Sequence, residues 1–391
     1  MLRNFMGLCV TSALIGAPFA GQVAAQETIK VGLVMPLTGV LGPVGKQAVA
    51  GARLYMAQHG DMAAGRKIEL IVRDDASVPD NSKRITQELI VSEKVAILGG
   101  GLTPNVLAIA PLVNESRTAT VVMVSGTSTV TEKSPYFVRT SWTHAQQASV
   151  LANWAAKSGS RRATIIASDW APGHEASGVF SSTFTQAGGS IVEALKVPLA
   201  NPDFAPFLQR ARDGNPDTLF IFVPASQAAI LAKQFVERGL DKSGIKLIGP
   251  GDIADDEDLP GMSDAMVGTV TAGFYSACHP SAMNKEYVAA FQKANANVRP
   301  NFISVSAYDG MHLIYEALKK TEGRTEGPAL VEAMKGTAWE SPRGPMSIDP
   351  KTRDVVQDIY IRRVEKVDGA LCSVELETFR AISDPAKMAN K

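Results

Sequence analysis

The sequence has no excess of either charge and only one long apolar run. Lysine plus arginine and aspartate plus glutamate each number 39 in its 391 residues, so the formal net charge at pH 7 is zero. A chain without a basic excess lacks the charge pattern that holds nucleic acid or an anionic membrane. Beyond the N-terminal region, no apolar stretch reaches the ~20 residues that cross a bilayer. We therefore expect a soluble globular protein with no nucleic-acid or membrane partner.

Cysteine is also scarce, with three in the whole chain. Cys9 lies in the N-terminal apolar run, which leaves Cys278 and Cys372 for the folded part. These two form neither a C-x-x-C motif nor a cluster with the ligand spacing of a metal site. One disulfide and two buried thiols both fit the pair, because sequence alone does not give their geometry.

The N-terminus has the order of a secretory signal. Arg3 precedes the apolar residues 6–20, and the small residues 23–25 (Val-Ala-Ala) follow them. The apolar run is shorter than the ~20 residues that span a bilayer, which favours a cleaved signal over a retained anchor. We predict a signal peptide over residues 1–25, cut after Ala25, and a mature protein that works outside the cytoplasm.

From Thr28 onward, short runs rich in valine, isoleucine and leucine alternate with amphipathic segments of helical length. This alternation predicts a mainly parallel sheet covered by helices. The chain is longer than the ~250–300 residues at which a single core stops growing, so two domains are expected. The clearest predicted strands are residues 28–35, 67–74, 95–100, 118–124, 162–168, 218–224 and 245–250.

The chain pattern divides these elements into two series. Residues 140–143 are interpreted as a crossover, residues 280–320 as helices that return to the first series, and the tail from Arg353 as a β-hairpin that turns at Asp368-Gly369. The predicted fold class is α/β, with two doubly wound lobes. We assign residues 26–142 and 276–349 to the first lobe and residues 143–275 and 350–391 to the second.

The turn after the first predicted strand, PLTGVLGPVGKQ at residues 36–47, resembles a phosphate loop and fails both phosphate templates. The P-loop motif requires glycine where Val40 stands and a hydroxyl residue where Gln47 stands. The glycines of the turn are spaced by three residues, which also breaks the dinucleotide fingerprint. We interpret the turn as part of the wall of a solute pocket, where Leu41 is a candidate to face the ligand.

No catalytic motif stands out. The sequence has no G-x-S-x-G and no H-E-x-x-H, and its five histidines are scattered without ligand spacing. Acidic pairs such as Asp255-Asp256 fall in loops or at strand ends, where solvated carboxylates are the ordinary interpretation. We expect no enzyme activity, no metal and no cofactor. An exported two-lobed enzyme stays as a less favoured alternative, because a cluster formed in space is invisible in sequence.

Four predicted strand ends are rich in glycine, serine and threonine: residues 99–103, 125–129, 168–173 and 249–252. Open α/β sheets hold ligands outside the carboxyl ends of their strands. Backbone N–H groups and hydroxyls that converge there would hold a carboxylate without a full opposing charge. Each segment alone fits a helix cap equally well, but four together, two in each predicted lobe, favour a cleft.

Four longer segments carry a family resemblance: IKVGLVMPLTGVLGPVGKQAVAGARL, LAIAPLVNESRTATVVMVSGTST, FVRTSWTHAQQ and PNFISVSAYDGMHLIYEAL. In this order, the chain resembles the type I periplasmic solute-binding proteins of ABC transporters, in the Leu/Ile/Val-binding group. The resemblance implies two Rossmann-like lobes joined by a three-strand hinge, and a small-molecule ligand enclosed by both lobes. It also implies a periplasmic location and delivery of the ligand to an inner-membrane ABC permease. A monomer is expected.

The resemblance also suggests site residues. In amino-acid binders of the family, the segment that matches residues 100–103 and the residues that match Thr127 and Thr129 hold the ligand's carboxylate and ammonium. The second lobe departs from the pattern, because Gly251, with Asp252 beside it, stands where branched-chain binders place a glutamate. The ligand-binding candidates are Gly100, Gly101, Leu102, Thr103, Ser125, Thr127, Thr129, Trp170 and Asp252, with Leu41, Trp142 and Tyr275 as further candidates.

Two ligand classes stay open. The one we favour is an amino acid, branched or otherwise apolar, bound as a buried zwitterion. The other is an aromatic or other organic carboxylate, with Trp142 and Trp170 stacked on its ring. For both tryptophans, packing inside the protein is an equal alternative. Asp252 separates the two classes, since only an amino acid offers it an ammonium group.

Overall fold

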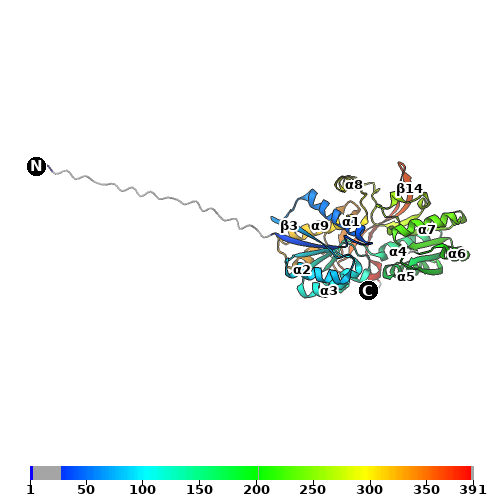
Figure 1. Cartoon of the computed structure of the whole chain (residues 1–391), viewed down its shortest axis with the longest axis horizontal. Helices are drawn as coiled ribbons and strands as arrows, with labels where there is room; N and C mark the ends of the chain where they lie inside the picture. The colour runs from blue at the N-terminus through cyan, green and yellow to red at the C-terminus, as the bar shows by residue number, and fades with distance from the viewer. Residues whose placement is uncertain (3–27, 201, 389–391) are drawn as a thin grey trace.

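The computed structural model describes residues 1–2, 28–200 and 202–388. They form two α/β lobes that lie side by side (Figure 1). The predicted signal peptide, residues 1–25, lies outside the described residues except for its first two. Within the described ranges, no helix combines the length and the apolar character needed to cross a membrane.

The first lobe is built on a sheet with the strand order β2-β3-β1-β4-β5-β6, in which all neighbours are parallel except β2 and β3. Helices α1 and α9 cover one face of this sheet, and α2 and α3 cover the other (Figure 1). The strands are β1 (Ile29–Met35), β2 (Met62–Ala63), β3 (Arg66–Asp74), β4 (Ile97–Gly100), β5 (Ala119–Val122) and β6 (Phe137–Arg139). The helices are α1 (Gly42–His59), α2 (Pro79–Val91), α3 (Thr103–Ser116), η1 (Ser128–Lys133), α8 (Ala282–Ala294), α9 (Phe302–Lys320) and α10 (Gly327–Met334).

The second lobe contains a sheet with the order β12-β13-β14-β11-β10-β9-β7-β8, and β15 pairs with β14. β7 to β11 run parallel to one another, whereas β12 to β15 are joined by antiparallel pairs. The strands are β7 (Arg162–Ser168), β8 (Ser190–Val197), β9 (Thr218–Phe222), β10 (Lys246–Pro250), β11 (Val270–Gly273), β12 (Ala338–Ser341), β13 (Gly344–Ile348), β14 (Val355–Val367) and β15 (Ala370–Ile382). The helices are α4 (His144–Lys157), α5 (Ala171–Gln186), α6 (Ala205–Asp213), α7 (Ala225–Glu237), η2 (Asp241–Ser243), η3 (Gly251–Ala254), η4 (Leu259–Gly261), η5 (Asp264–Met266) and α11 (Pro385–Met388).

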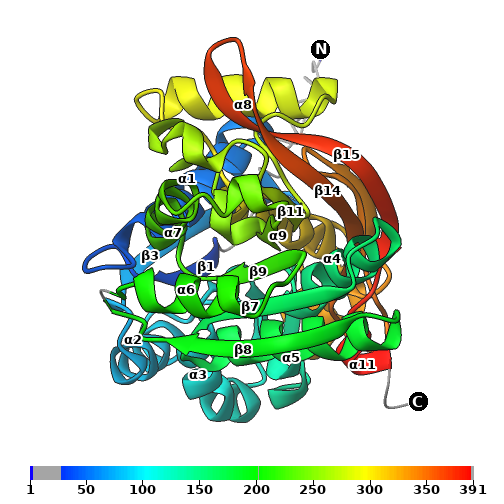
Figure 2. The same cartoon turned by 90° about the vertical axis from the view of Figure 1, so that its right-hand side faces the viewer.

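The C-terminal strands form the hairpin that the sequence predicts. β14 ends at Val367 and β15 begins at Ala370, so the turn falls at Asp368-Gly369. Figure 2 shows this hairpin curving along one edge of the molecule, with its turn beside α8. Cys278, which precedes α8, and Cys372 on β15 form a disulfide, with Cα atoms 6.2 Å apart. Of the two states left open for these cysteines, the structure therefore has the disulfide.

The chain passes between the lobes at residues 140–143 and 274–281, and returns through β12 and β13. β12 and β13 fall inside the range predicted for the first lobe, yet their strand pairing joins them to β14. They also contact the first lobe, because Trp339 Nε1 donates to Asp309 of α9 at 3.1 Å. Both lobes hold this hairpin, so the lobe boundaries that we assigned stay a prediction.

The predicted α/β class with two doubly wound lobes is confirmed, and each of the seven predicted strands overlaps an observed one. β8 was not among them. It lies at the edge of the sheet and is half exposed, so its sequence lacks the continuous apolar run of a buried strand.

Candidate functional site

The structure brings together three hydroxyl residues that the sequence predicts at the site. Thr103 Oγ1 lies 2.6 Å from Ser125 Oγ and 3.5 Å from Thr127 Oγ1. Thr103 begins α3 just after β4, and the other two follow β5. Because β4 and β5 are neighbouring parallel strands, their carboxyl ends meet at one edge of the first sheet. Together with Gly100, Gly101 and Leu102, these residues form what we call the first-lobe wall.

Gly101 gives the first-lobe wall its close turn. Its φ of 86° is in the left-handed region, and a Cβ there would lie 2.2 Å from Val106 Cγ2. The backbone N–H of Gly101 donates to the Val34 carbonyl at 3.2 Å. A residue with a side chain would therefore move the start of α3 away from β1.

The alternative interpretation of the four strand ends was that their side chains cap the following helices, and the structure does not have such caps. The N-cap positions of α3, η1, α5 and η3 make no side-chain capping hydrogen bond, and those of α3 and α5 are occupied by Leu102 and Trp170. The first N–H groups of a helix have no partner within the helix. Without a side-chain cap, the N-termini of α3 and α5 have the polarity that attracts an anion.

A buried arginine supports the first-lobe wall from behind. Arg139 donates to the Thr127 carbonyl at 2.6 Å and to the Trp142 carbonyl at 2.9 Å. Its Nε lies 3.0 Å from Asp354 Oδ1, and both side chains are almost fully buried. Lys387 of α11 also pairs with Asp354. The chain end thereby joins the network that positions the loop after β5.

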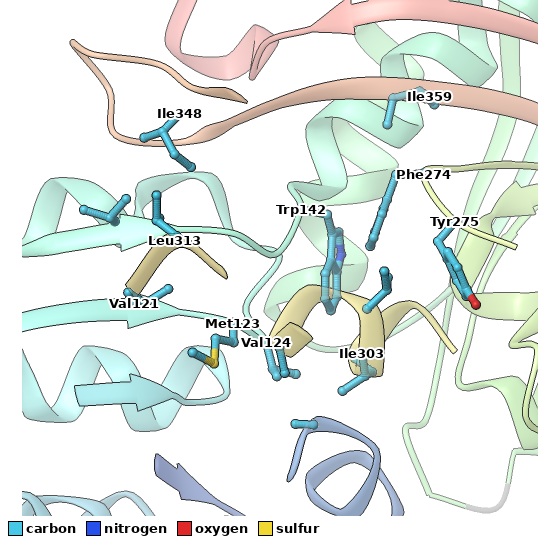
Figure 3. Close-up of a cluster of buried hydrophobic side chains, with 14 of the residues drawn as sticks. Val121, Met123, Val124, Trp142, Phe274, Tyr275, Ile303, Leu313, Ile348 and Ile359 are labelled. Atoms are coloured by element: carbon cyan, nitrogen blue, oxygen red, sulfur yellow. The ribbon is translucent and has the colours of Figure 1, made fainter. Parts of the chain in front are cut away.

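Aromatic side chains fill the space beside the first-lobe wall. Trp142 stacks on Phe274 with ring centroids 5.7 Å apart and meets Phe302 edge-on at 4.9 Å. His144 lies edge-on to Trp142 at 6.2 Å and to Phe222 at 5.2 Å. Figure 3 shows Trp142 and Phe274 facing one another where the two lobes meet. We call these five residues the aromatic group.

The aromatic group borders the first-lobe wall directly. A Cβ on Gly126, between Ser125 and Thr127, would lie 2.7 Å from Trp142 Nε1 and 2.5 Å from His144 Nε2. Burial, and secondarily the charge of Arg139, lower the pKa of His144 to about 3, so its imidazole is neutral near pH 7. Trp142 Nε1 and His144 Nδ1 have no hydrogen-bond partner within the described chain.

The opposite side of the site is charged. It consists of Gly251 and Asp252 after β10, Gly273 at the end of β11, and Arg362 of β14, and we call it the second-lobe wall. The Arg362 Nη1 donates to the Tyr275 carbonyl, and its Nε to Thr271 Oγ1 at 3.3 Å. A Cβ on Gly251 or Gly273 would lie 2.5 or 2.4 Å from Arg362 Nη2. A side chain at either position would therefore displace the guanidinium from its place in this wall.

Three carboxylates on the loop after β10 act electrostatically on this arginine. Burial raises the pKa of Asp252 to about 6 and that of Asp256 to about 6, and the nearby Arg362 opposes both shifts. Burial also raises the pKa of Asp255 well above its usual value. Asp252 Oδ2 and the hydroxyl of Tyr275 have no hydrogen-bond partner among the described residues.

These groups line a narrow cavity between the lobes. Its volume is about 10 Å³, which is room for about one water molecule. The lobes also touch directly, because Ser128 N donates to Glu175 of α5 at 2.9 Å and Asn301 Nδ2 donates to Asp255 Oδ2 at 3.0 Å. Ligand pockets typically measure ~300–1,000 Å³, so a ligand enters only if the lobes separate. The lining residues are Gln147, Gly251, Asp252, Ala254, Asp256, Gly273, Phe274, Tyr275, Phe302 and Arg362.

The remaining predicted site residues are spread more widely. Trp142 and Tyr275 are buried at the junction, with exposed fractions of 5% and 1%. Trp170 and Leu41 are each 38% exposed, and neither lines the cavity. Thr129 is exposed on η1. The roles of these residues in binding stay predictions.

Sequence reasoning did not find Arg362, Phe302, Gln147 or the role of His144. Gln147 of α4 accepts from Gly251 N at 2.8 Å and so fixes the loop after β10. These residues come from elements far apart in sequence, which no local motif connects. One signal was present: Arg362 follows the apolar residues 359–361 of β14, where both faces of the strand are buried and a charged side chain is unusual.

The structure has two Rossmann-like lobes, and the chain crosses the junction between them several times. Polar strand ends lie on both sides of this junction. These features define a solute-binding protein of the hinged, two-lobed class. Residues 28–370 match the family model described as "Periplasmic binding protein".

Solved structures agree with this match. One is a solute-binding protein of an ABC transporter from Rhodopseudomonas palustris BisB5 in complex with 3,4-dihydroxybenzoic acid, with 56% sequence identity and a TM-score of 0.88; the alignment covers 92% of this chain and 99% of that one. Another, from Rhodopseudomonas palustris HaA2, is in complex with p-hydroxybenzoic acid; its identity is 41%, its TM-score 0.89, and the coverage 93% and 100%.

A curated relative carries a different ligand name. The Leu/Ile/Val-binding protein homolog 6 of Brucella suis is 38% identical over 383 residues, which cover 97% of this chain and 98% of the relative. The chain belongs to the periplasmic binding protein family, the solute-binding components of ABC transporters.

Proposed function

We propose that the ligand of this solute-binding protein is an aromatic carboxylate of the benzoate class. The observation that carries the proposal is the aromatic group, which places the rings of Trp142, Phe274 and Phe302 between the two walls. Aromatic rings prefer stacked or edge-on contacts with one another, so this group offers matched surfaces to a flat ring. The benzoate derivatives bound by the relatives that are 56% and 41% identical support the same ligand class.

The first-lobe wall suits the carboxylate end of such a ligand. It has hydroxyls on Thr103, Ser125 and Thr127 and the uncapped N-terminus of α3, and none of its residues is acidic. Hydrogen bonds to an ionised carboxylate are stronger than those between neutral groups. The wall therefore binds an anion without a buried counter-charge of its own.

An amino acid is the second candidate, supported by the name of the Brucella relative. Its ammonium would need an anionic partner, and Asp252 is the acidic side chain of the second-lobe wall. Asp252 shares that wall with Arg362, whose positive charge acts on it. A buried cation close to a second cation is unfavourable at low dielectric, which makes the site less suited to a zwitterion.

The biological setting follows from the family together with the N-terminus. We propose that residues 1–25 direct export to the periplasm, that the protein acts as a monomer, and that it delivers its ligand to an inner-membrane ABC permease. Closing of the lobes over the ligand would present the closed form to that permease.

A ligand panel tests the proposed class. The purified protein is heated with benzoate, 4-hydroxybenzoate, cyclohexanecarboxylate, leucine or valine. A ligand at a hundredfold excess over its Kd stabilises the fold by ~2.7 kcal/mol, which a melting curve resolves. We expect the benzoates to raise the melting temperature most. Cyclohexanecarboxylate is the matched control, because it keeps the carboxylate and approximate size but has no aromatic face.

Two outcomes would overturn the proposal. Stabilisation by leucine or valine, with none by the aromatic acids, would assign the site to amino acids. Equal stabilisation by benzoate and cyclohexanecarboxylate would show that the aromatic group does not select for an aromatic ring over a saturated one. Conversion of a ligand, followed by chromatography of the same samples, would revive the enzyme alternative.

A further inference from the structure

Two polar groups of the second-lobe wall remain unpaired at the cavity. Asp252 Oδ2 is buried and has no hydrogen-bond partner within the described chain. Arg362 is 2% exposed and uses Nε and Nη1 for protein contacts, whereas none of the hydrogen bonds among the described residues involves its Nη2. Both residues line the same cavity. Buried polar groups are usually satisfied, so an unpaired acceptor beside an unpaired donor indicates a missing partner.

The missing partner must both donate and accept a hydrogen bond. A hydroxyl does so, because its O–H donates to a carboxylate and its lone pairs accept from a guanidinium. We propose that Asp252 and Arg362 together bind a ring hydroxyl of the ligand, and that the site therefore selects hydroxylated benzoates over benzoate itself. This inference rests on the proposed function, since it assigns the second end of the same aromatic acid.

Other groups fit the pair less well. An ammonium would satisfy Asp252 but face the Arg362 guanidinium. A second carboxylate would satisfy Arg362 but face Asp252, with Asp255 and Asp256 on the same loop. A neutral hydroxyl avoids both repulsions, because it brings no charge into a buried site.

The arrangement of the two walls gives the position of the hydroxyl. In the proposed binding mode, the carboxylate lies at the first-lobe wall. That wall borders Trp142 and His144, whereas Phe274 and Phe302 line the cavity together with Asp252 and Arg362. In a benzoate, the carboxylate and the substituent at the 4-position point in opposite directions from the planar ring. A hydroxyl at the 4-position therefore reaches the pair, whereas a 2-hydroxyl lies beside the carboxylate and does not.

A series of ligands tests the proposal on the unaltered protein. Isothermal titration calorimetry at pH 7.5, above the pKa of about 6 of Asp252, compares benzoate, 2-hydroxybenzoate, 4-hydroxybenzoate and 4-methoxybenzoate. A hydrogen bond to a charged group is a strong one. We therefore expect the Kd of 4-hydroxybenzoate to be lower than those of the other three acids by a factor of about ten or more. The 4-methoxy compound is the sharpest control, since its oxygen accepts but does not donate.

Variants assign the effect to residues. In Asp252→Asn, the preference for 4-hydroxybenzoate over benzoate should fall by about tenfold, while the affinity for benzoate changes little. Asp258→Asn is the matched control, because it removes the same charge from an exposed position on the same loop and should leave the preference unchanged. Circular dichroism confirms that each variant is folded, and the ligand series stands if Asp252→Asn is not.

The outcomes separate this inference from the proposed function. If none of the four acids binds the unaltered protein, the proposed function and the inference both fail. If benzoate or 4-methoxybenzoate binds as tightly as 4-hydroxybenzoate, the ligand class stands and hydroxyl recognition is wrong. An equal loss of affinity for benzoate and 4-hydroxybenzoate in Asp252→Asn also overturns the inference, because Asp252 would then act on the ring or the fold.

Discussion

The two walls of the cleft differ in charge and in the way their polar groups are paired. On the first-lobe wall, neutral hydroxyls hydrogen-bond to one another, and the wall is formed by two short stretches at neighbouring strand ends. The second-lobe wall combines Asp252 and Arg362, from distant parts of the chain, and leaves Asp252 Oδ2 without a hydrogen-bond partner among the described residues. We propose from this difference that the two lobes have separate roles: the first lobe binds the carboxylate common to many solutes, and the second lobe distinguishes among them.

The largest expected effect is on the second-lobe wall. Arg362→Met should lower the free energy of unfolding by about 3–5 kcal/mol, because it removes a buried cation together with its hydrogen bonds to the Tyr275 carbonyl and Thr271 Oγ1. Asp252, Asp255 and Asp256 all act electrostatically on Arg362, which is almost fully buried. Urea unfolding followed by circular dichroism measures the change. The exposed neighbour gives the control, since Arg363→Met should change stability by less than about 0.5 kcal/mol. A change of less than about 1 kcal/mol in Arg362→Met would mean that the buried arginine does not hold this wall together.

The disulfide should have the next largest effect. It joins Cys278 in the segment between the lobes to Cys372 on the strand beside β14, which carries Arg362, across 94 residues. Cross-linking a loop of this length restricts the unfolded chain, and its removal typically costs about 2–4 kcal/mol. We expect reduction, or the double change Cys278→Ser and Cys372→Ser, to lower the urea midpoint by a corresponding amount. Reductant added to the double variant is the control, and a further loss of stability there would contradict the assignment.

The raised pKa values of the second-lobe wall predict a dependence of stability on pH. A carboxyl whose pKa is about 6 when folded and near 4 when unfolded binds its proton more tightly in the folded state. Stability should therefore rise as the pH falls from 7 to 5, by about 1 kcal/mol for each such carboxyl. Arg362 on β14 is the charged neighbour of both groups, and Arg299 and Asp255 are further charged neighbours of Asp256.

Unfolding curves at intervals between pH 5 and 7 test this dependence. Asp252→Asn should reduce the slope, because one of the two carboxyls that titrate near pH 6 is removed. His144 should add nothing in this range, since its pKa is about 3. A variant with the same slope as the unaltered protein would show that Asp252 is ionised in both states throughout the range.

The difference between the two walls also explains which site residues could be predicted from the sequence. The first-lobe wall consists of two short stretches that each follow a predicted strand, so the glycine and hydroxyl residues at those strand ends were sufficient to predict that Thr103, Ser125 and Thr127 lie together. Arg362 and Phe302 reach the site only through the path of the chain between the lobes. Leu41 and Trp170 were predicted from the same kind of strand-end segment as Thr103, but their side chains are partly exposed and do not line the cavity. Strand-end chemistry thus predicts which edge of a sheet is used, whereas side-chain direction depends on packing between lobes.

The smallest expected effect lies on the first-lobe wall. Thr103→Val removes a hydroxyl while it keeps the volume of the side chain, so the fold should lose at most about 1 kcal/mol. Both ligands share the carboxylate that this wall is proposed to bind, so the loss of the Thr103 hydroxyl should weaken the binding of benzoate and 4-hydroxybenzoate by the same factor. We expect a factor of about three to ten, because the Thr103 hydroxyl is also bonded to Ser125. Calorimetry with both ligands gives the ratio. Thr185→Val, at an exposed position near the end of α5, is the control and should leave both affinities unchanged. A change in the ratio in Thr103→Val would mean that the first lobe also distinguishes among ring substituents, and the proposed separate roles of the two lobes would be wrong.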